Sequence, residues 1–150
     1  MAAWIDHVRR AAPYTYEFRC PKVGEVTGAG YPVGEDNREI WPHYTESLSF
    51  EHDKPFDLYF IDGRFRVAFA ARALLHGQGA PVMVHDYFRY GDALEEIADA
   101  PLPEVALCPV TRKAGHVSNA ECSLRVLTRK QGVTDDQLRA FYERHKYEQP

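Results

Sequence analysis

Two aspartates near the middle of the chain are the residues best placed to do chemistry. Asp62 follows the apolar run 58–61, and Asp86 stands just beyond a second apolar run, 81–84. Paired carboxylates can bind a hard metal ion, act as a base, or hold a ribose or an amine. The repeated pattern of an apolar run followed by an acid therefore predicts one polar site that contains both aspartates.

Three neighbouring residues could belong to the same site. Gly63 allows a sharp turn or a close approach of the backbone to a ligand, and Arg64 offers a fork-shaped cation for a carboxylate. His85 could accept a proton, but side chains alternate along a strand, so we expect it to point to the face opposite Asp86. Structural roles stay open: Asp62 could cap the following helix, and Arg64 could simply pair with one of the acids.

Patterns for other kinds of site are missing from the sequence. The Gly-rich stretch 23–32 is not GxGxxG, so we interpret it as a plain loop. No GxSxG nucleophile motif is present. The three cysteines form no CxxC and the remaining histidines lack metal-ligand spacing, which predicts no metal site. We interpret the cysteines as free, buried thiols in a reducing compartment.

Hydrophobic periodicity indicates the elements that position the two aspartates. The run 58–61 is typical of a strand buried on both faces, and 81–84 predicts a second such strand. Helical spacing over 65–76 predicts the connecting helix. Two strands joined in this way form a parallel βαβ unit with a right-handed crossover. Because ligands bind outside the carboxyl ends of such strands, we expect Asp62 and Asp86 within about one ligand's width of each other.

Weaker patterns predict the remaining elements of a single α/β domain spanning residues 1–150. The apolar, capping and turn signals place helices over residues 2–12, 42–48 and 90–100, strands over 14–20, 105–110 and 120–128, and a last helix opened by the capping box 134–137. The strands 105–110 and 120–128 are expected to form an antiparallel hairpin.

Composition limits the partners of this domain. The 18 basic and 22 acidic residues give a net charge of −4, which argues against a general nucleic-acid binder. No apolar run approaches the ~20 residues of a membrane span. The N-terminus carries charges too early for a signal peptide. We therefore expect a cytoplasmic protein that binds neither nucleic acid nor membrane.

The run FDLYFIDGRFRVAFAARALLHGQGAPVMVHDYFRY resembles the second half of class I S-adenosylmethionine-dependent methyltransferases. Its two strands are similar to the fourth and fifth strands of that family, and the expected hairpin matches the family's closing antiparallel pair. The WPHY stretch, with Trp41 and Tyr44, is similar to a subgroup that has a Gly-Pro loop before this strand. The resemblance covers about residues 4–130. It implies a Rossmann-like three-layer sandwich with a mostly parallel sheet and a C-terminal antiparallel hairpin.

The resemblance also implies roles for the candidate residues in methyl transfer from S-adenosylmethionine to a small molecule or sugar. Asp62 and Gly63, with Arg64 beside them, would lie at the methionine end of the cofactor. Asp86 would face the methyl acceptor or a metal, and we expect Asp86 and His85 to be the catalytic residues.

One departure from the family pattern changes what we expect of this chain. The family's Gly-rich turn after its first strand, and the acid that ends its second strand, have no counterpart before Trp4. The sequence therefore predicts an N-terminally truncated domain that is inactive or impaired, with an exposed sheet edge through which a homodimer could form. Two alternatives stay open: a non-catalytic binding or assembly module, and a metal-dependent enzyme that uses Asp62 and Asp86.

Overall fold

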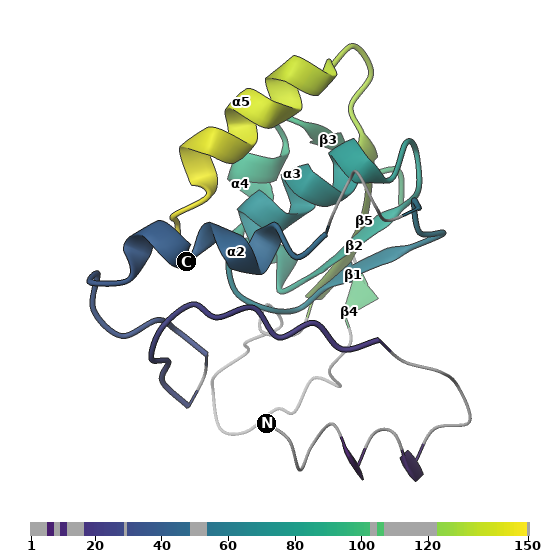
Figure 1. The fold of residues 1–150 in the computed structure, drawn as a ribbon. Helices are drawn as coiled ribbons and strands as arrows, with labels where there is room; N and C mark the ends of the chain where they lie inside the picture. Colours follow the sequence, from purple (N-terminus) through teal and green to yellow (C-terminus); the bar gives the residue numbers. More distant parts are fainter. Residues whose placement is uncertain are drawn as a thin grey trace, which may run out of the picture.

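The computed structural model describes residues 6–7, 10–11, 17–28, 30–48, 54–102, 105–106 and 123–149. A mixed sheet with the strand order β1-β2-β5-β3 forms the centre, and β4 also pairs with β5. The strands are β1 (Tyr59–Ile61), β2 (Val82–His85), β3 (Ala98–Asp99), β4 (Val105–Ala106) and β5 (Ser123–Arg129). The helices are α2 (Pro42–Thr45), α3 (Arg66–His76), α4 (Gly91–Leu94) and α5 (Asp135–His145), with the short 3-10 helices η1 (Arg38–Ile40) and η2 (Tyr87–Arg89). Figure 1 shows the helices gathered on one side of the sheet.

The predicted βαβ unit is confirmed. Strands β1 and β2 are parallel neighbours, with Tyr59 opposite Val82 and Ile61 opposite Val84. These four side chains are buried on one face of the sheet, beneath α3. Because the two strands run the same way, their carboxyl ends lie side by side at one edge, which is where the predicted site residues follow them.

Helix α3 packs on the sheet through the residues that its periodicity indicates. Val67, Ala70, Ala71 and Leu74 are all buried. The small alanines let the helix approach the strands closely, and apolar burial of this kind stabilises a fold by about 25 cal/mol per Å². Helix α5 packs along α3 in turn (Figure 1).

The C-terminal helix α5 begins as its capping box predicts. The Thr134 hydroxyl accepts a hydrogen bond from the Gln137 backbone N–H, and the Gln137 side chain accepts one from the Thr134 N–H. These bonds satisfy donors that the first turn of a helix leaves free. The docking residues Leu138, Phe141 and Tyr142 are buried, as expected.

The third layer implied by the resemblance is not formed by the described residues. Phe60 points to the face of the sheet opposite α3 and is 58% exposed, and Met83 beside it is only half-buried. No described helix covers Phe60. The part of the chain that the structure describes therefore contains a sheet with helices on one face.

Several weaker predictions need correction. The helix expected over 90–100 is only α4, because the chain then turns and Ala98 and Asp99 pair with β5 as strand β3. The helix expected over 42–48 begins at Pro42 but ends at Thr45. Residues 17–20 of the strand expected at 14–20 lie in no strand, and Cys20 is exposed rather than buried.

Other predictions fall partly outside the described residues. The expected hairpin is confirmed where it is described, since β4 and β5 pair antiparallel, while residues 107–122 lie outside that part. Most of the helix expected over 2–12 also lies outside it.

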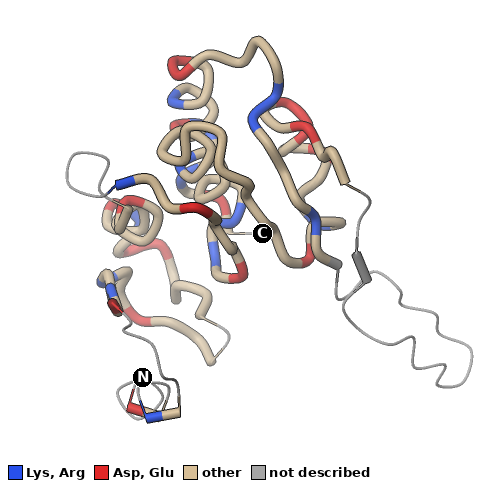
Figure 2. The backbone as a smooth tube through the Cα atoms, turned by 90° about the vertical axis from the view of Figure 1, so that its right-hand side faces the viewer, with Lys and Arg blue, Asp and Glu red and all other residues tan. Residues whose placement is uncertain are grey.

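The distribution of charge and of apolar residues in the described elements agrees with what the composition predicts. Basic and acidic positions are interspersed along the described chain (Figure 2), rather than gathered in one basic stripe. Among the described helices, none combines the length and the apolar character that crossing a bilayer requires.

Candidate functional site

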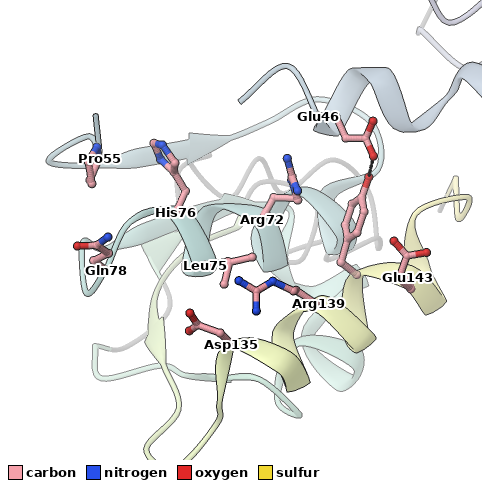
Figure 3. Close-up of a pocket in the computed structure, with 10 residues that line it drawn as sticks. Glu46, Pro55, Arg72, Leu75, His76, Gln78, Asp135, Arg139 and Glu143 are labelled. Carbon is pink, nitrogen blue, oxygen red and sulfur yellow. Dashed lines mark hydrogen bonds between the residues drawn. The ribbon is translucent and has the colours of Figure 1, made fainter. Parts of the chain in front are cut away.

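A cavity of about 600 Å³ lies against α3 and α5 and contains none of the predicted site residues. Arg72 and Arg139 line it together with the carboxylates of Glu46, Asp135 and Glu143 (Figure 3). Charges of both signs therefore line this cavity.

Burial shapes the ionisation of the groups at this α3–α5 contact. Burial, with the neighbouring Glu46 as a smaller cause, raises the pKa of Tyr142 to about 12. Its hydroxyl donates to Glu46 at 3.1 Å and lies 3.0 Å from the Thr45 hydroxyl. Burial also lowers the pKa of Arg72 from its ordinary value. We interpret the cavity as a cleft between packed helices, whose polar groups hold the helices together.

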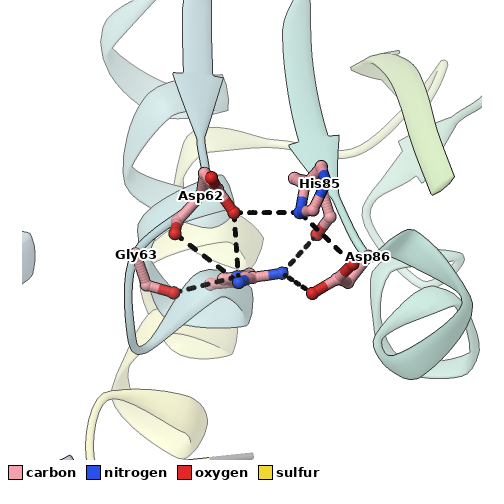
Figure 4. A network of polar contacts seen from close by, with 5 residues as sticks. Asp62, Gly63, His85 and Asp86 are labelled. Carbon is pink, nitrogen blue, oxygen red and sulfur yellow. Dashed lines mark hydrogen bonds and ion pairs between the residues drawn. The ribbon is translucent and has the colours of Figure 1, made fainter. Parts of the chain in front are cut away.

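Four of the predicted site residues, Asp62, Gly63, His85 and Asp86, meet instead at the carboxyl ends of β1 and β2 in a strand-end cluster around Arg66 (Figure 4). The Arg66 guanidinium lies 3.2 Å from Asp62 Oδ1 and 2.9 Å from Asp86 Oδ2, and its side chain is only 3% exposed. It also donates to the carbonyl oxygens of Gly63 at 2.9 Å and His85 at 2.6 Å. The predicted proximity of Asp62 and Asp86 is thus confirmed, and a buried cation holds them together.

His85 joins the same cluster, which corrects the expectation that it points away. Its Nδ1 lies 2.9 Å from Asp62 Oδ1 and 3.2 Å from Asp86 Oδ1. Asp86 has a left-handed backbone, with φ 54°. This conformation interrupts the alternation of a strand and lets two adjacent side chains turn toward one site.

The contacts of His85 are close in distance but poorly aligned. His85 Nδ1 and Asp86 Oδ1 are both buried without a well-directed hydrogen bond, although they lie 3.2 Å apart. Buried polar atoms that lack such a bond are rare and call for an explanation, of which a catalytic role is one. Two carboxylates beside Nδ1 favour a proton on that nitrogen, an assignment made from the contacts. The other ring nitrogen, Nε2, then carries a lone pair that can accept a hydrogen bond.

Gly63 is required by a neighbouring tyrosine. A Cβ on Gly63 would lie 1.9 Å from the Tyr44 hydroxyl oxygen, so the tyrosine occupies the space that a side chain would fill. This face of Gly63 is therefore closed by protein atoms. Tyr44 packs in turn against the ring of Phe65 at 5.9 Å.

Arg64 lies outside the cluster and faces a second cavity. Its guanidinium stacks on the ring of Tyr31 at 4.2 Å, and no described acid pairs with it. Neither Asp62 nor Asp86 pairs with Arg64, so the structural alternative that Arg64 pairs with one of these acids is wrong. Arg66 takes that role. The cavity beside Arg64 has a volume of about 530 Å³ and lies against the Gly-rich loop that we interpreted as plain.

Neither a helix cap nor a metal-binding arrangement is seen among the described residues of the site. The residue that precedes α3 is Phe65, and no side chain caps this helix, so the capping role considered for Asp62 is not seen. Within the described residues, no group of three or more His, Cys, Asp or Glu side chains is arranged to hold a metal ion. Arg66 supplies the positive charge between the two acids.

Comparisons with known proteins bear on the fold. No protein-family model matches the sequence, and no curated protein is significantly similar to it. The structure is similar to the crystal structure of a methyltransferase-like protein from Silicibacter pomeroyi, with a TM-score of 0.62 and 20% identity. The match covers 99% of this chain and 73% of that chain. This chain has a methyltransferase-like fold. At 20% identity the likeness shows the fold alone, and the activity has to be argued from the site.

Sequence reasoning missed Arg66, which lies at the centre of the strand-end cluster between Asp62 and Asp86. Its spacing of four residues from Asp62 was the available signal, because an acid and a base at i and i+4 can pair at the start of a helix. Arg64 directly follows Gly63, and we therefore interpreted Arg64 as the arginine of the site.

Proposed function

We propose that this chain is a methyltransferase-like protein that acts on a small molecule or sugar at the carboxyl ends of β1 and β2. The observation that carries this proposal is the placing of His85 Nδ1 2.9 Å from Asp62 and 3.2 Å from Asp86, where ligands bind in open parallel sheets. An acid–imidazole pair of this kind can take a proton from a hydroxyl or an amine.

Each residue of the cluster has a distinct part in the proposal. Asp62, whose side chain is 49% exposed, orients the imidazole and can also accept a hydrogen bond from a hydroxylated ligand. His85 would accept a hydrogen bond at Nε2 from the hydroxyl or amine of the bound small molecule. Asp86, 16% exposed, would favour a proton on Nδ1, which leaves Nε2 as the acceptor. Arg66 is a positioning residue that holds the two strand ends together.

The described residues do not by themselves make a site that fits S-adenosylmethionine. The cofactor carries a positive sulfonium and a pair of ribose hydroxyls that need an acceptor. The cavity beside Arg64 is lined by three basic residues and by no described acid. Asp62 does not line that cavity, and Tyr44 closes the face of Gly63. We therefore expect weak binding of the cofactor or none, and we derive no methyl-transfer step from the predicted roles of Asp62, Gly63 and Arg64.

A titration followed by NMR tests the acceptor site. We expect a monosaccharide or simple phenol from a panel to shift the amide signals of His85 and Asp86 in a saturable way. The variant His85→Gln should lose these shifts, whereas His43→Gln, which changes an exposed histidine on α2, should keep them. A panel in which no compound moves these signals, or equal binding by His85→Gln, would contradict the proposed site.

A second candidate is a non-catalytic binding or assembly module that forms a homodimer through the sheet edge. One specific observation favours it: the residues in and before edge strand β1 expose large apolar side chains, with Phe56, Leu58 and Phe60 being 46%, 48% and 58% exposed. An exposed strand edge with apolar neighbours tends to pair with another chain.

Light scattering after size-exclusion chromatography tests the assembly candidate. We expect a concentration-dependent dimer that Phe60→Lys abolishes. Leu102→Lys is the matched control, because Leu102 is similarly exposed, at 55%, but lies outside β1. A monomer at all concentrations, or equal loss of the dimer in both variants, would exclude this edge as the interface.

A further inference from the structure

The cavity of about 530 Å³ beside Arg64 has a different character from the strand-end cluster. It lies between residues 19–26 and Gly30, which include part of the Gly-rich loop 23–32, and the turn that leads from β1 into α3. Its volume is within the range of about 300–1,000 Å³ that is usual for small-molecule sites. We propose that this cavity binds an organic monoanion, namely a carboxylate attached to an apolar body.

The apolar part of the lining determines the body of the ligand. Val23, Val26 and Ile40 contribute aliphatic surface, and Tyr44 and Phe65 contribute rings. Phe65 itself is only 2% exposed and is fixed between the rings of Trp41 and Tyr44. A rigid apolar wall of this kind favours an aromatic or aliphatic body over a sugar.

Arg64 determines the charge of the ligand. Its side chain is half-buried, and its described contact is the Tyr31 ring, which covers one face of the guanidinium without neutralising it. The planar fork of an arginine matches the two oxygens of a carboxylate. The Arg64 guanidinium is partly buried, stacks on an aromatic ring and has no described acid beside it. It can therefore bind an anionic head group.

The contacts of the other basic residues of the lining, Arg19 and Lys22, indicate that the ligand carries one anionic group. Arg19 already contacts Glu17 at 2.6 Å and the Ser47 carbonyl oxygen at 2.8 Å. Lys22 is exposed, so it adds only a screened positive charge. One available guanidinium in an apolar cavity suits a monoanion better than a polyphosphate. The absence of a described acid from the lining disfavours a cationic ligand.

Gly30 brings the loop close to this arginine. A Cβ on Gly30 would lie 3.9 Å from Arg64 Cγ, and the glycine has φ 79°. A left-handed backbone of this kind favours glycine. The Gly-rich loop therefore closes one side of the cavity over the stem of Arg64, in addition to connecting neighbouring segments.

Calorimetry with 4-phenylbutyrate tests the proposal, with the neutral 4-phenylbutanamide as the matched ligand. We expect the acid to bind at least about tenfold more tightly than the amide, because charge-assisted hydrogen bonds to Arg64 depend on the carboxylate. Arg64→Gln should weaken binding of the acid by about tenfold or more. Arg38→Gln should leave it unchanged, since Arg38 also stacks on a tyrosine, Tyr147 at 4.8 Å, but lies outside the cavity.

Four outcomes would overturn the proposal. They are equal affinity for the acid and the amide, unchanged binding by a folded Arg64→Gln protein, no saturable binding of 4-phenylbutyrate at millimolar concentrations, and displacement of the acid by S-adenosylmethionine. The thermal unfolding of each variant provides the check that it is folded. The acceptor site is tested separately through His85, so failure of one proposal does not decide the other.

Discussion

Two arginines that stand two positions apart serve different regions of this molecule. Arg66 is buried between the strand ends and holds Asp62 and Asp86, whereas Arg64 is half-buried on the Tyr31 ring beside a cavity. Phe65 between them has a left-handed backbone with φ 55°, which is rare for a bulky residue. The turn sends the two side chains to different neighbours. Arg66 thus stabilises the strand-end cluster, whereas the charge of Arg64 is available to a ligand in the cavity.

Removing each arginine separately is the strongest way to break this comparison. Arg66→Leu should lower the free energy of unfolding by about 3–5 kcal/mol, because it leaves the carboxylate of Asp86 buried without its cation. Arg64→Leu should cost less than about 1 kcal/mol, since it breaks no ion pair with a described acid. Urea unfolding measures both. Equal losses would show that the two side chains do not differ in structural role.

Gly63 contacts both regions, because its carbonyl oxygen accepts from Arg66 and its Cα lies against Tyr44, which lines the cavity beside Arg64. Gly63→Ala should destabilise the protein by about 1–3 kcal/mol, because the new methyl group would lie 1.9 Å from the Tyr44 hydroxyl oxygen. The double variant with Tyr44→Phe should regain much of this loss, since the nearest remaining atom of that ring is 3.0 Å away. Thermal unfolding of the four proteins in this cycle provides the measurement. A harmless Gly63→Ala change would mean that this face is open to a ligand.

The smallest expected effect concerns a third arginine, Arg72, at the α3–α5 contact. Burial raises the pKa of Tyr142 to about 12, above its ordinary value of 10.0, while the nearby charge of Arg72 lowers it. The unfolded chain therefore loses this proton first as the pH rises. The contribution of Tyr142 to stability is complete below pH 10.0 and is lost as the pH rises through about 12.

The ultraviolet absorbance of ionised tyrosine measures this effect as the difference between the wild type and Tyr142→Phe. Arg72→Gln should raise the pKa of Tyr142 further, because a neighbouring positive charge is removed. A Tyr142 that ionises near pH 10.0 would show that the contact between the helices opens in solution.

The sequence predicted the parts of the site that depend on local pattern and simple topology. The apolar runs of β1 and β2 and the helical period of α3 were sufficient to place Asp62 beside Asp86. The direction of His85 was predicted wrongly, because the left-handed backbone of Asp86 depends on its surroundings more than on residue type.

Long-range pairing accounts for the helix that was predicted too long. Leu94 and Ile97 are both buried, as a helix over 90–100 would require. The same spacing also suits a short helix followed by a turn. Ala98 pairs with Arg129, which is 31 residues away along the chain, and such a contact leaves no trace in local periodicity.

The central claim is that this methyltransferase-like fold keeps a polar acceptor site, while its described residues do not complete a cofactor site. Titration calorimetry with S-adenosylmethionine tests this claim most directly. Losing two hydrogen bonds to a charged group, worth about 1.5–3 kcal/mol each, weakens binding by about two to four powers of ten. We therefore predict no saturation at micromolar concentrations of the cofactor. A micromolar dissociation constant for this chain would contradict the account and would assign cofactor binding to the Gly-rich loop beside Arg64.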